Sequence, residues 1–266
     1  MRNIPAFLTK KPVYGKTYFG STMLLNLREK LSWHIFATGR WETAESATLE
    51  KTLKTAHTFY DIGANIGYFS LMASNIIGSS GKVYAIEASP KNVSSLQQNI
   101  LLNNHSNIIV YPYGLSHHTG SGLINQHAES GMSSFLPNFK TEEQYTVPLI
   151  PLDELIRAEH LQPPDVIKID VEGMELDVIR GMKSTLSANR HITLLVEITA
   201  EFLESQGDSE IELYKILFDY GFRKSQLIHP VAYQHAGKTG YQTNVLFEKE
   251  GLATNAAPRS AVQVET

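Results

Sequence analysis

The chain has 266 residues, of which 42% are hydrophobic and 19% charged, with a formal net charge of -4 at pH 7 and no cysteine. This composition excludes disulfides and thiolate metal sites, and the scattered lysines and arginines give no basic cluster for a nucleic-acid backbone. The N-terminal residues contain no apolar run of signal-peptide length, and no later run approaches the ~20 apolar residues of a membrane span. We therefore expect a cytoplasmic protein with one folded domain of about 200 to 250 residues.

Predicted strands alternate with predicted helices from residue 58 to about residue 221, which is typical of an α/β fold with a mostly parallel sheet and helices on both faces. The expected strands, in chain order, are seven: "TFYDI", "KVYAIEA", "NIIVYPYGL", "DVIKID", "HITLLVEI", "FRKSQLI" and "TNVLFEK". Helices are expected at about residues 66–77, from Ser89 and Pro90 to about 104, at 173–182 and at 208–221.

Three segments lie outside this alternation. Residues 1–57 are expected to form an N-terminal helical segment that acts as a lid, followed by the main domain at residues 58–249. Residues 116–151 are a long insert after the third strand, in which the alternation of "YTVPLI" predicts antiparallel strands beside the main sheet. Residues 250–266 are polar and aperiodic, so we expect a flexible tail.

The segment "YDIGANIGYF", residues 60–69, joins the first strand to the first helix through two glycines and an acid. Glycine lets the backbone curl beneath a ligand that faces the helix N-terminus, so the turn indicates a nucleotide-type cofactor. Its order, D-x-G-x-x-x-G, is not the G-x-G-x-x-G of dinucleotide folds, and the acid would repel a phosphate. The turn instead suits S-adenosylmethionine, which carries a cationic amino-acid moiety. An ordinary tight strand-to-helix turn is the alternative interpretation.

Glu87 ends the second strand about 20 residues after Gly67, where a carboxylate can accept hydrogen bonds from both ribose hydroxyls. A solvated carboxylate at a strand end is the alternative. The predicted cofactor-binding residues are Asp61, Gly63, Gly67 and Glu87, together with Asn65, which could instead cap the helix, and Ser116 after the third strand.

The fourth predicted strand, "DVIKIDVEG", carries charges where a central strand should be apolar. Alternation puts Lys168 and Asp170 on the same side, and Glu172 follows directly. A buried charge is costly unless it is paired, so we expect Asp170, Glu172 or Glu197 to neutralise Lys168 at the carboxyl edge of the sheet, where open α/β sheets bind ligands. A purely structural ion pair is the alternative.

Five segments together resemble the FkbM family of S-adenosylmethionine-dependent methyltransferases. They are "FYDIGANIGYFSLMAS", "VYAIEASPKNVSSLQQNILLNN", "VPLIPLDEL", "VIKIDVEGMELDVIRGM" and "LLVEI", and the resemblance covers roughly residues 41 to 248. It implies a class I Rossmann-like methyltransferase fold and O-methylation of a hydroxyl on a sugar, polyketide or related metabolite. It also implies that Asp170 and Glu172 lie at the reaction centre, and the segment "RWETAES" makes Glu42 a further candidate.

Methyl transfer to an aliphatic hydroxyl needs precise positioning and a group that takes the proton. Asp170 is the first candidate for that group, with Glu172 and Lys168 beside it, and His117 and His118 are alternatives because an imidazole titrates near neutral pH. We expect Ser133, Ser134 and His117 to contact the acceptor. Asp170, Glu172 and Glu197 could also hold a divalent ion, but no spacing signature requires a metal, and we predict none.

Two other functions fit parts of the same sequence. A nucleic-acid methyltransferase would share the cofactor half, but "IDVEG" is not the Asp/Asn-Pro-Pro-aromatic motif that base-modifying enzymes of this fold resemble. A non-catalytic cofactor-binding protein could keep the same fold. We therefore expect a small-molecule hydroxyl acceptor as the partner, and neither nucleic acid nor membrane. The sequence predicts neither the identity of the acceptor nor the oligomeric state.

Overall fold

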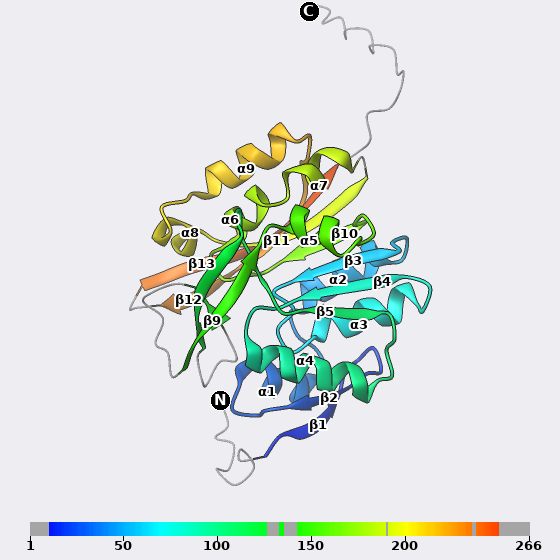
Figure 1. Cartoon of the computed structure of the whole chain (residues 1–266). Helices are drawn as coiled ribbons and strands as arrows, with labels where there is room; N and C mark the ends of the chain where they lie inside the picture. The colour runs from blue at the N-terminus through cyan, green and yellow to red at the C-terminus, as the bar shows by residue number, and fades with distance from the viewer. Residues whose placement is uncertain (1–10, 127–132, 136–142, 190, 236–237, 250–266) are drawn as a thin grey trace, which may run out of the picture.

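The computed structural model describes residues 11–126, 133–135, 143–189, 191–235 and 238–249, with only the backbone of Ser133 and of residues 229–235 and 238–241. Its centre is a seven-stranded sheet of order β12-β13-β11-β10-β3-β4-β5 (Figure 1). The five strands from β11 to β5 are parallel, whereas β13 runs antiparallel to β11 and β12. The expected mostly parallel, seven-stranded α/β fold is confirmed. The strands are β3 Thr58–Ile62, β4 Lys82–Ile86, β5 Ile108–Tyr111, β10 Val166–Ile169, β11 Ile192–Thr199, β12 Arg223–His235 and β13 Lys238–Lys249.

The strand order reverses at β3. The chain moves outward from β3 to β4 and β5, and then returns to place β10 on the other side of β3. Such a switch point leaves a crevice outside the carboxyl ends of the two neighbouring strands, because the connections leave in opposite directions. The residues that follow β3 and β10 therefore meet at one edge of the sheet.

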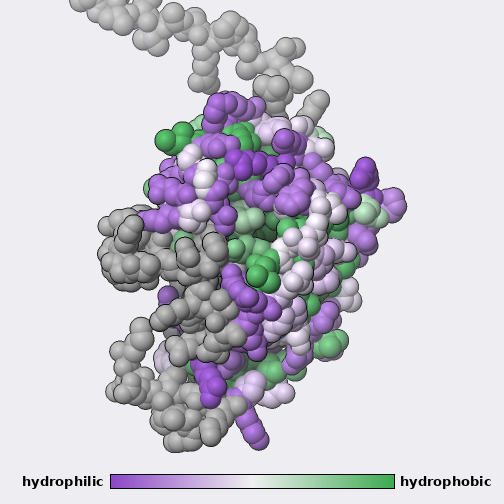
Figure 2. Space-filling view, turned by 60° about the vertical axis from the view of Figure 1, so that its left-hand side comes forward, coloured by the Kyte–Doolittle hydropathy of each residue, from purple (hydrophilic) through white to green (hydrophobic). Residues whose placement is uncertain are grey.

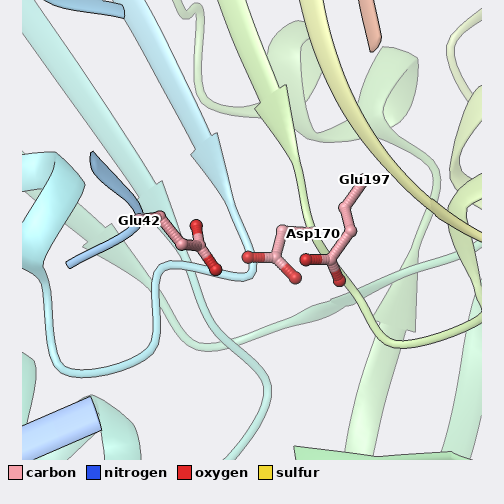
Figure 3. Close-up of side chains that lie close together, drawn as sticks. All are labelled: Glu42, Asp170 and Glu197. Carbon is pink, nitrogen blue, oxygen red and sulfur yellow. The ribbon is translucent and has the colours of Figure 1, made fainter. Parts of the chain in front are cut away.

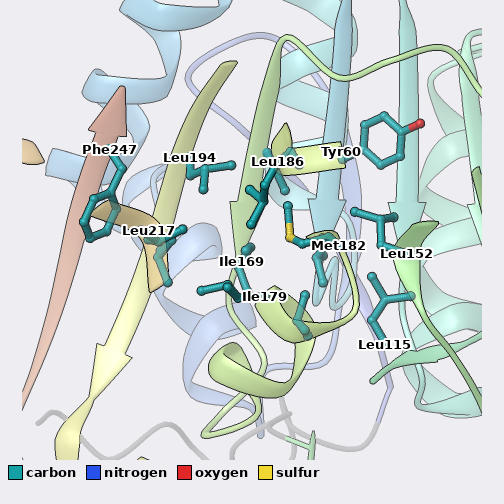
Figure 4. Packing of buried hydrophobic residues seen from close by; sticks show 14 of the residues in the cluster. Tyr60, Leu115, Leu152, Ile169, Ile179, Met182, Leu186, Leu194, Leu217 and Phe247 are labelled. Carbon is teal, nitrogen blue, oxygen red and sulfur yellow. The ribbon is translucent and has the colours of Figure 1, made fainter. Parts of the chain in front are cut away.

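Two hydrophobic clusters pack the two faces of this sheet. Ile167 and Ile169 of β10 belong to the cluster under α5, α6, α7, α8 and α9, part of which Figure 4 shows. Val166 belongs to the cluster under α1 to α4, as period-2 alternation requires. The helices are α1 Lys30–Thr38, α2 Thr43–Leu53, α3 Tyr68–Ile77, α4 Pro90–Leu102, α5 Leu152–Ala158, α6 Glu175–Arg180, α7 Lys183–Ala188, α8 Ala200–Ser205 and α9 Glu210–Asp219.

Helix boundaries follow local chemistry that the sequence reveals only in part. Ser89 caps α4 by accepting a hydrogen bond from the Asn92 amide, as expected. Helix α3 begins at Tyr68 and not at Ile66, because Gly67 precedes it in a left-handed conformation with φ 92°. The helix expected at 173–182 corresponds to α6, which ends before Gly181, and a further helix, α7, follows that the sequence did not predict. A Cβ at Gly181 would lie 2.2 Å from the Ser116 carbonyl oxygen, so the chain approaches the insert too closely for any larger residue.

The segments outside the main sheet also contain strands. The N-terminal segment carries a hairpin of β1 Val13–Lys16 and β2 Thr22–Leu25 besides its expected helices. A second sheet of order β6-β9-β7-β8 contains the strands of the insert, and β7 and β9 are antiparallel as "YTVPLI" predicted. The strand expected at "NIIVYPYGL" is divided, because β5 pairs with β4 of the central sheet and β6 pairs with β9 of the second sheet. Its strands are β6 Gly114–Leu115, β7 Gly120–Gln126, β8 Ser133–Ser134 and β9 Glu143–Ile150.

Among the coloured residues in Figure 2, hydrophilic ones are interspersed with hydrophobic ones, which show near the top, in the middle and lower on the face. In the part of the chain that the structure describes, no helix has the length and apolar character needed to cross a membrane.

Candidate active site

A cavity of about 460 Å³ lies at the carboxyl edge of the central sheet. Much of its wall comes from the turns after β3 and β4, the turn after β10, the end of β11 with β13, and the start of α2. Residues of α1, α4 and β12, residues 113–115, Ile124 of β7 and Phe135 after β8 also line it. The cavity thus occupies the switch-point crevice and joins the two halves of the sequence that carry the predicted site residues.

The glycine turn after β3 packs directly against the end of β10. Gly63 has φ 82°, and a Cβ there would lie 1.8 Å from the carbonyl oxygen of Asp170. Gly67 has φ 92°, and a Cβ there would lie 2.4 Å from Cδ1 of Leu96. Both positions favour glycine for the backbone conformation, and Gly63 also for the space, because its neighbour is backbone, whereas the end of the Leu96 side chain can move. Gly63 and Ala64 line the cavity, and the amides of both donate to the carbonyl oxygen of Ile86 at 3.0 Å.

Asp61 lies in β3, directly before the turn, and is not among the described residues that line the cavity. Its side chain is 1% exposed, and its Oδ2 accepts a hydrogen bond of 2.5 Å from the Ser70 hydroxyl. Among the described residues its Oδ1 has no hydrogen-bond partner. Burial raises the pKa of Asp61, and Lys168 opposes that rise. Its predicted contact with a cofactor stays a prediction, because the structure places Ile62 and Gly63 between Asp61 and the cavity wall.

Glu87 lines the cavity at the end of β4 and is held on both oxygens. Its Oε2 accepts the amide hydrogen of Asn65, and its Oε1 that of Ser89, each at 2.8 Å. Burial raises the pKa of Glu87 to about 7, although these two amides lower it. A carboxylate can accept about four hydrogen bonds, so Glu87 retains capacity for donors inside the cavity. Asn65 lies in the left-handed region with φ 51°, and the bond to Glu87 stabilises that conformation.

Lys168 is the buried cation of the site. It is 1% exposed, and its Nζ lies 2.5 Å from Oδ2 of Asp170 and 4.7 Å from the ring centroid of Phe69. Burial alone lowers the pKa of Lys168, but Asp170, Glu42, Asp61 and Glu197 together raise it above its ordinary value. The expected neutralisation of Lys168 is confirmed, and Asp170 is the direct partner. Lys168 therefore remains an ammonium at neutral pH.

Three carboxylates converge beside this ion pair: Glu42, Asp170 and Glu197 (Figure 3). One oxygen from each lies within 4.8 Å of the other two, which is close enough to hold a divalent ion. Burial raises the pKa of Glu42 to about 8 and that of Glu197 well above its ordinary value. Glu197 also accepts a hydrogen bond from the Gln242 amide. At neutral pH the group can therefore hold protons as well as negative charge.

Glu172 lies on the same turn as Asp170 and also lines the cavity. It has φ 53°, a left-handed conformation that is unusual for a residue other than glycine. Burial raises the pKa of its carboxyl group well above its ordinary value. Its carbonyl oxygen accepts a hydrogen bond of 3.1 Å from the Ser134 hydroxyl, so the insert is joined to this turn. Ser134 therefore lies near the site through the backbone of Glu172.

Ser116, His117 and His118, which the sequence analysis named for the site, are not among the described residues that line this cavity. Ser116 is fully buried, and its Oγ is 3.0 Å from Nδ1 of His118. His117 pairs with Asp177 through its ring, and it borders a second cavity of about 470 Å³ together with Arg180. The structure does not bring His117, His118 or Ser116 to the wall of the first cavity among its described residues. The side chain of Ser133 lies outside the described part of the chain.

The cavity also contains residues that the sequence did not single out, namely Trp41, Tyr113, Phe135, Met174, Gln242 and Asn244. Asn244 donates a hydrogen bond of 3.1 Å to Oε1 of Glu45, across 199 positions in sequence. Only Trp41 had a signal in the sequence, because it precedes Glu42 in "RWETAES". The others reach the site through tertiary packing of β13 and the insert.

Comparison with known proteins places these features in context. The sequence model described as the methyltransferase FkbM domain matches residues 61–224. The hexuronic acid methyltransferase AglP of Haloferax volcanii is 31% identical over 141 residues, which cover 53% of this chain and 55% of that protein. Methyltransferase 1 of Beauveria bassiana is 27% identical over 168 residues, which cover 56% of this chain and 65% of that protein. The chain thus spans less than two thirds of the length of either relative.

Among solved structures, the methyltransferase FkbM of Methylobacillus flagellatus is similar with a TM-score of 0.46 and 18% identity. The similarity covers 71% of this chain and 43% of that one. An O-methyltransferase of Bacillus cereus is similar with a TM-score of 0.46 and 16% identity, covering 79% of this chain and 83% of that one.

Proposed function

Because the chain belongs to the FkbM family of S-adenosylmethionine-dependent methyltransferases, we propose that it methylates a hydroxyl oxygen of a sugar or a related small metabolite. The main support for the proposal is that Glu87 and Asp170 line the same cavity. One half of that cavity has the glycine turn and an acid that can accept further hydrogen bonds. The other half has the ion pair and the carboxylates.

The residues of the first half fit S-adenosylmethionine. Gly63 lines the cavity beside Glu87, and Glu87 has lone pairs for the hydroxyls of a ribose. Gly63, Asn65 and Glu87 would therefore hold the adenosine part of the cofactor. When bound, S-adenosylmethionine supplies a methyl group that is already activated for transfer to a nucleophile.

The second half would position and deprotonate the acceptor. Lys168 holds one oxygen of Asp170, whose side chain remains 20% exposed, so the carboxylate has a fixed orientation toward the cavity. Asp170 would accept a hydrogen bond from the acceptor hydroxyl and receive its proton as the oxygen becomes nucleophilic. Glu42 and Glu197 lie close enough to share that proton. Their raised pKa values would allow them to hold it near neutral pH.

A sugar acceptor is supported by the relative in Haloferax volcanii, which is named as a hexuronic acid methyltransferase. The composition of the cavity agrees with a polyhydroxylated ligand, since the carboxylates Glu42 and Glu172 and the amide of Gln242 offer hydrogen-bonding groups beside the ring of Trp41. The same carboxylates would repel the phosphates of a nucleic acid.

Calorimetry and a transfer assay test the proposal. We expect S-adenosylmethionine and its demethylated product to bind, and labelled methyl groups to appear on at least one member of a panel of hexoses, hexuronic acids and their glycosides. Glu87→Ala should weaken cofactor binding, because two or more charge-assisted hydrogen bonds of about 1.5–3 kcal/mol each are lost. Absence of cofactor binding by the wild-type chain, or undiminished binding by Glu87→Ala, would contradict the assignment.

A further inference from the structure

The turn that joins β10 to α6 presents most of its side chains to the cavity. Asp170, Val171, Glu172 and Met174 all line it, so the conformation of this turn determines where both acids point. Two consecutive residues in it are left-handed, Glu172 with φ 53° and Gly173 with φ 102°. Glycine adopts this conformation freely, whereas a glutamate does so only where surrounding contacts enforce it. Some group must therefore hold Glu172 in place.

Glu175 supplies those contacts. It is the first residue of α6 and is 1% exposed. Its Oε1 accepts the amide hydrogen of Gly173 at 3.0 Å and that of Val171 at 3.3 Å. One carboxylate oxygen thus binds the amides on both sides of Glu172. Glu175 itself is not among the described residues that line the cavity, so it does not reach a ligand there.

We propose that Glu175 is a positioning residue, which fixes the turn so that Asp170 and Glu172 face the acceptor. The inference rests on the proposed function, because the orientation of this turn matters for the reaction only if the two acids act on an acceptor. Removal of the carboxylate would leave two amides of the turn without their acceptor. The left-handed conformation at Glu172 would then lose its support and relax toward an ordinary one.

The second oxygen of Glu175 indicates that the contact holds in either protonation state. Oε2 is buried and has no hydrogen-bond partner among the described residues. A proton on Oε2 would leave Oε1 free to accept both amide hydrogens, as in the ionised form. Burial raises the pKa of Glu175 to about 7, so both forms occur near neutral pH. A glutamine, which has the shape of the protonated acid, should therefore replace Glu175 with little effect on the turn.

The experiment compares Glu175→Ala and Glu175→Gln in the full chain, with Glu29→Ala as the control. Glu29 is similarly buried, at 6% exposure. Its partners are Asn26, Ser32 and Lys91, which are not part of the turn after β10. Three quantities are measured: hydrogen exchange of the Val171 and Gly173 amides, the Kd for S-adenosylhomocysteine, and kcat and KM with an acceptor.

In Glu175→Ala we expect exchange of both amides to accelerate by ~10-fold or more, because their acceptor is gone. The value of kcat should fall by roughly 10- to 100-fold, since a displacement of about 1 Å at a reacting group has an effect of this size. The Kd should change less than kcat, because Glu87 lies on another turn, whereas Gly63 contacts the backbone of Asp170 and can transmit part of the displacement. Glu175→Gln should restore exchange and kcat, and Glu29→Ala should leave both unchanged.

Unchanged exchange of the two amides in Glu175→Ala would overturn the proposal, and so would an equal loss of kcat in Glu29→Ala. A Glu175→Gln variant that keeps both amides protected but transfers as slowly as Glu175→Ala would also overturn it. If Glu175→Ala does not fold, Glu175→Asp provides the comparison, because its shorter side chain cannot span both amides. A wild-type chain that binds cofactor but methylates no acceptor contradicts the proposed function instead, and amide exchange then decides alone whether Glu175 fixes the turn.

Discussion

Gly63 touches the backbone of Asp170: a side chain at position 63 would begin 1.8 Å from the Asp170 carbonyl oxygen. The cofactor turn and the predicted catalytic turn are therefore in van der Waals contact through their main chains, although 107 positions separate them in sequence. Because protein interiors are close-packed, a shift of one turn must displace the other. This contact couples the two halves of the site mechanically.

Replacement of Gly63 by alanine should consequently damage both halves. The new Cβ meets backbone atoms, which cannot rotate away, and the residue must also keep φ 82°. Gly20→Ala is the matched control, because Gly20 has φ 94° and nothing within 4 Å of its Cβ position. We expect a loss of about 1–3 kcal/mol for Gly20→Ala from backbone strain and clearly more for Gly63→Ala, with weakened cofactor binding only in the latter. Equal losses of unfolding free energy in the two variants, measured by urea denaturation, would show that the contact between Gly63 and Asp170 does not contribute to stability.

The sequence predicted the parts of this architecture that depend on local patterns. Ser89 followed by Pro90 predicted the start of α4, and alternation in "DVIKID" placed Lys168 and Asp170 on one face of β10. It did not predict α7, nor the close approach of Gly181 to the Ser116 carbonyl group, 65 positions earlier, because such a contact depends on the tertiary fold.

The same limit applies to the site. Glu42 was a candidate through the family resemblance of "RWETAES", whereas Asn244 enters the cavity from a segment without fixed spacing relative to β10, so only the tertiary fold brings it there. His117 was expected at the acceptor, but its ring pairs with Asp177 of α6, and an isolated sequence does not specify that partner. Nothing in the sequence around Gln242 distinguishes it from a residue on the surface.

Stability should fall as the pH rises from about 5 to 8. Burial raises the pKa of Glu87 from 4.5 to about 7 and that of Glu42 to about 8. The folded chain therefore binds protons that the unfolded chain has already released, and folding becomes less favourable through this range, by on the order of 3 kcal/mol for Glu87 alone. Burial lowers the pKa of His105, which acts in the opposite direction.

Glu87→Gln isolates this contribution. The variant lacks the titrating group, whereas His105 contributes equally to both proteins, so the difference in unfolding free energy between variant and wild type should grow from pH 5 to pH 7 and then level off. Urea denaturation at four pH values provides the measurement. A difference that stays constant with pH would mean that the Glu87 carboxyl titrates at its ordinary value.

Asp170→Asn should lower turnover by about 10²- to 10⁴-fold, the usual effect of removing a positioned general base, while cofactor affinity changes much less. Asp165→Asn at the opposite end of β10 is the matched control. Asp165 accepts the amide hydrogens of His57 and Thr58 at 2.7 and 2.9 Å, so its replacement affects the fold without touching the cavity. Steady-state assays with a methylated acceptor compare the two variants. Near-normal turnover in Asp170→Asn would remove Asp170 from the mechanism.

Lys168→Met should destabilise the fold strongly, because methionine fills similar space but leaves the buried carboxylates without their counter-ion. Asp170 loses its direct partner at 2.5 Å, and Glu42, Asp61 and Glu197 lose a favourable charge nearby. Breaking a buried ion pair from one side typically costs 3–5 kcal/mol, so we expect a loss of about that size in urea denaturation. Lys215→Met is the control, since the pair of Lys215 with Asp219 is exposed to solvent and should contribute little.

The double variant Lys168→Met, Asp170→Asn separates the ion pair from the bulk of the side chain. If the loss in Lys168→Met comes from the unpaired carboxylate, Asp170→Asn should recover part of it, with a coupling energy of about 0.5–3 kcal/mol between the two positions.

Addition of Mg²⁺ or Mn²⁺ to Lys168→Met extends the test, because Glu42, Asp170 and Glu197 would then offer three carboxylates without the competing ammonium. If the metal stabilises Lys168→Met and not the wild type, the ammonium group of Lys168 takes the place that a metal cation could occupy among the carboxylates. Additive losses in the double variant would instead mean that Lys168 supports the fold independently of Asp170.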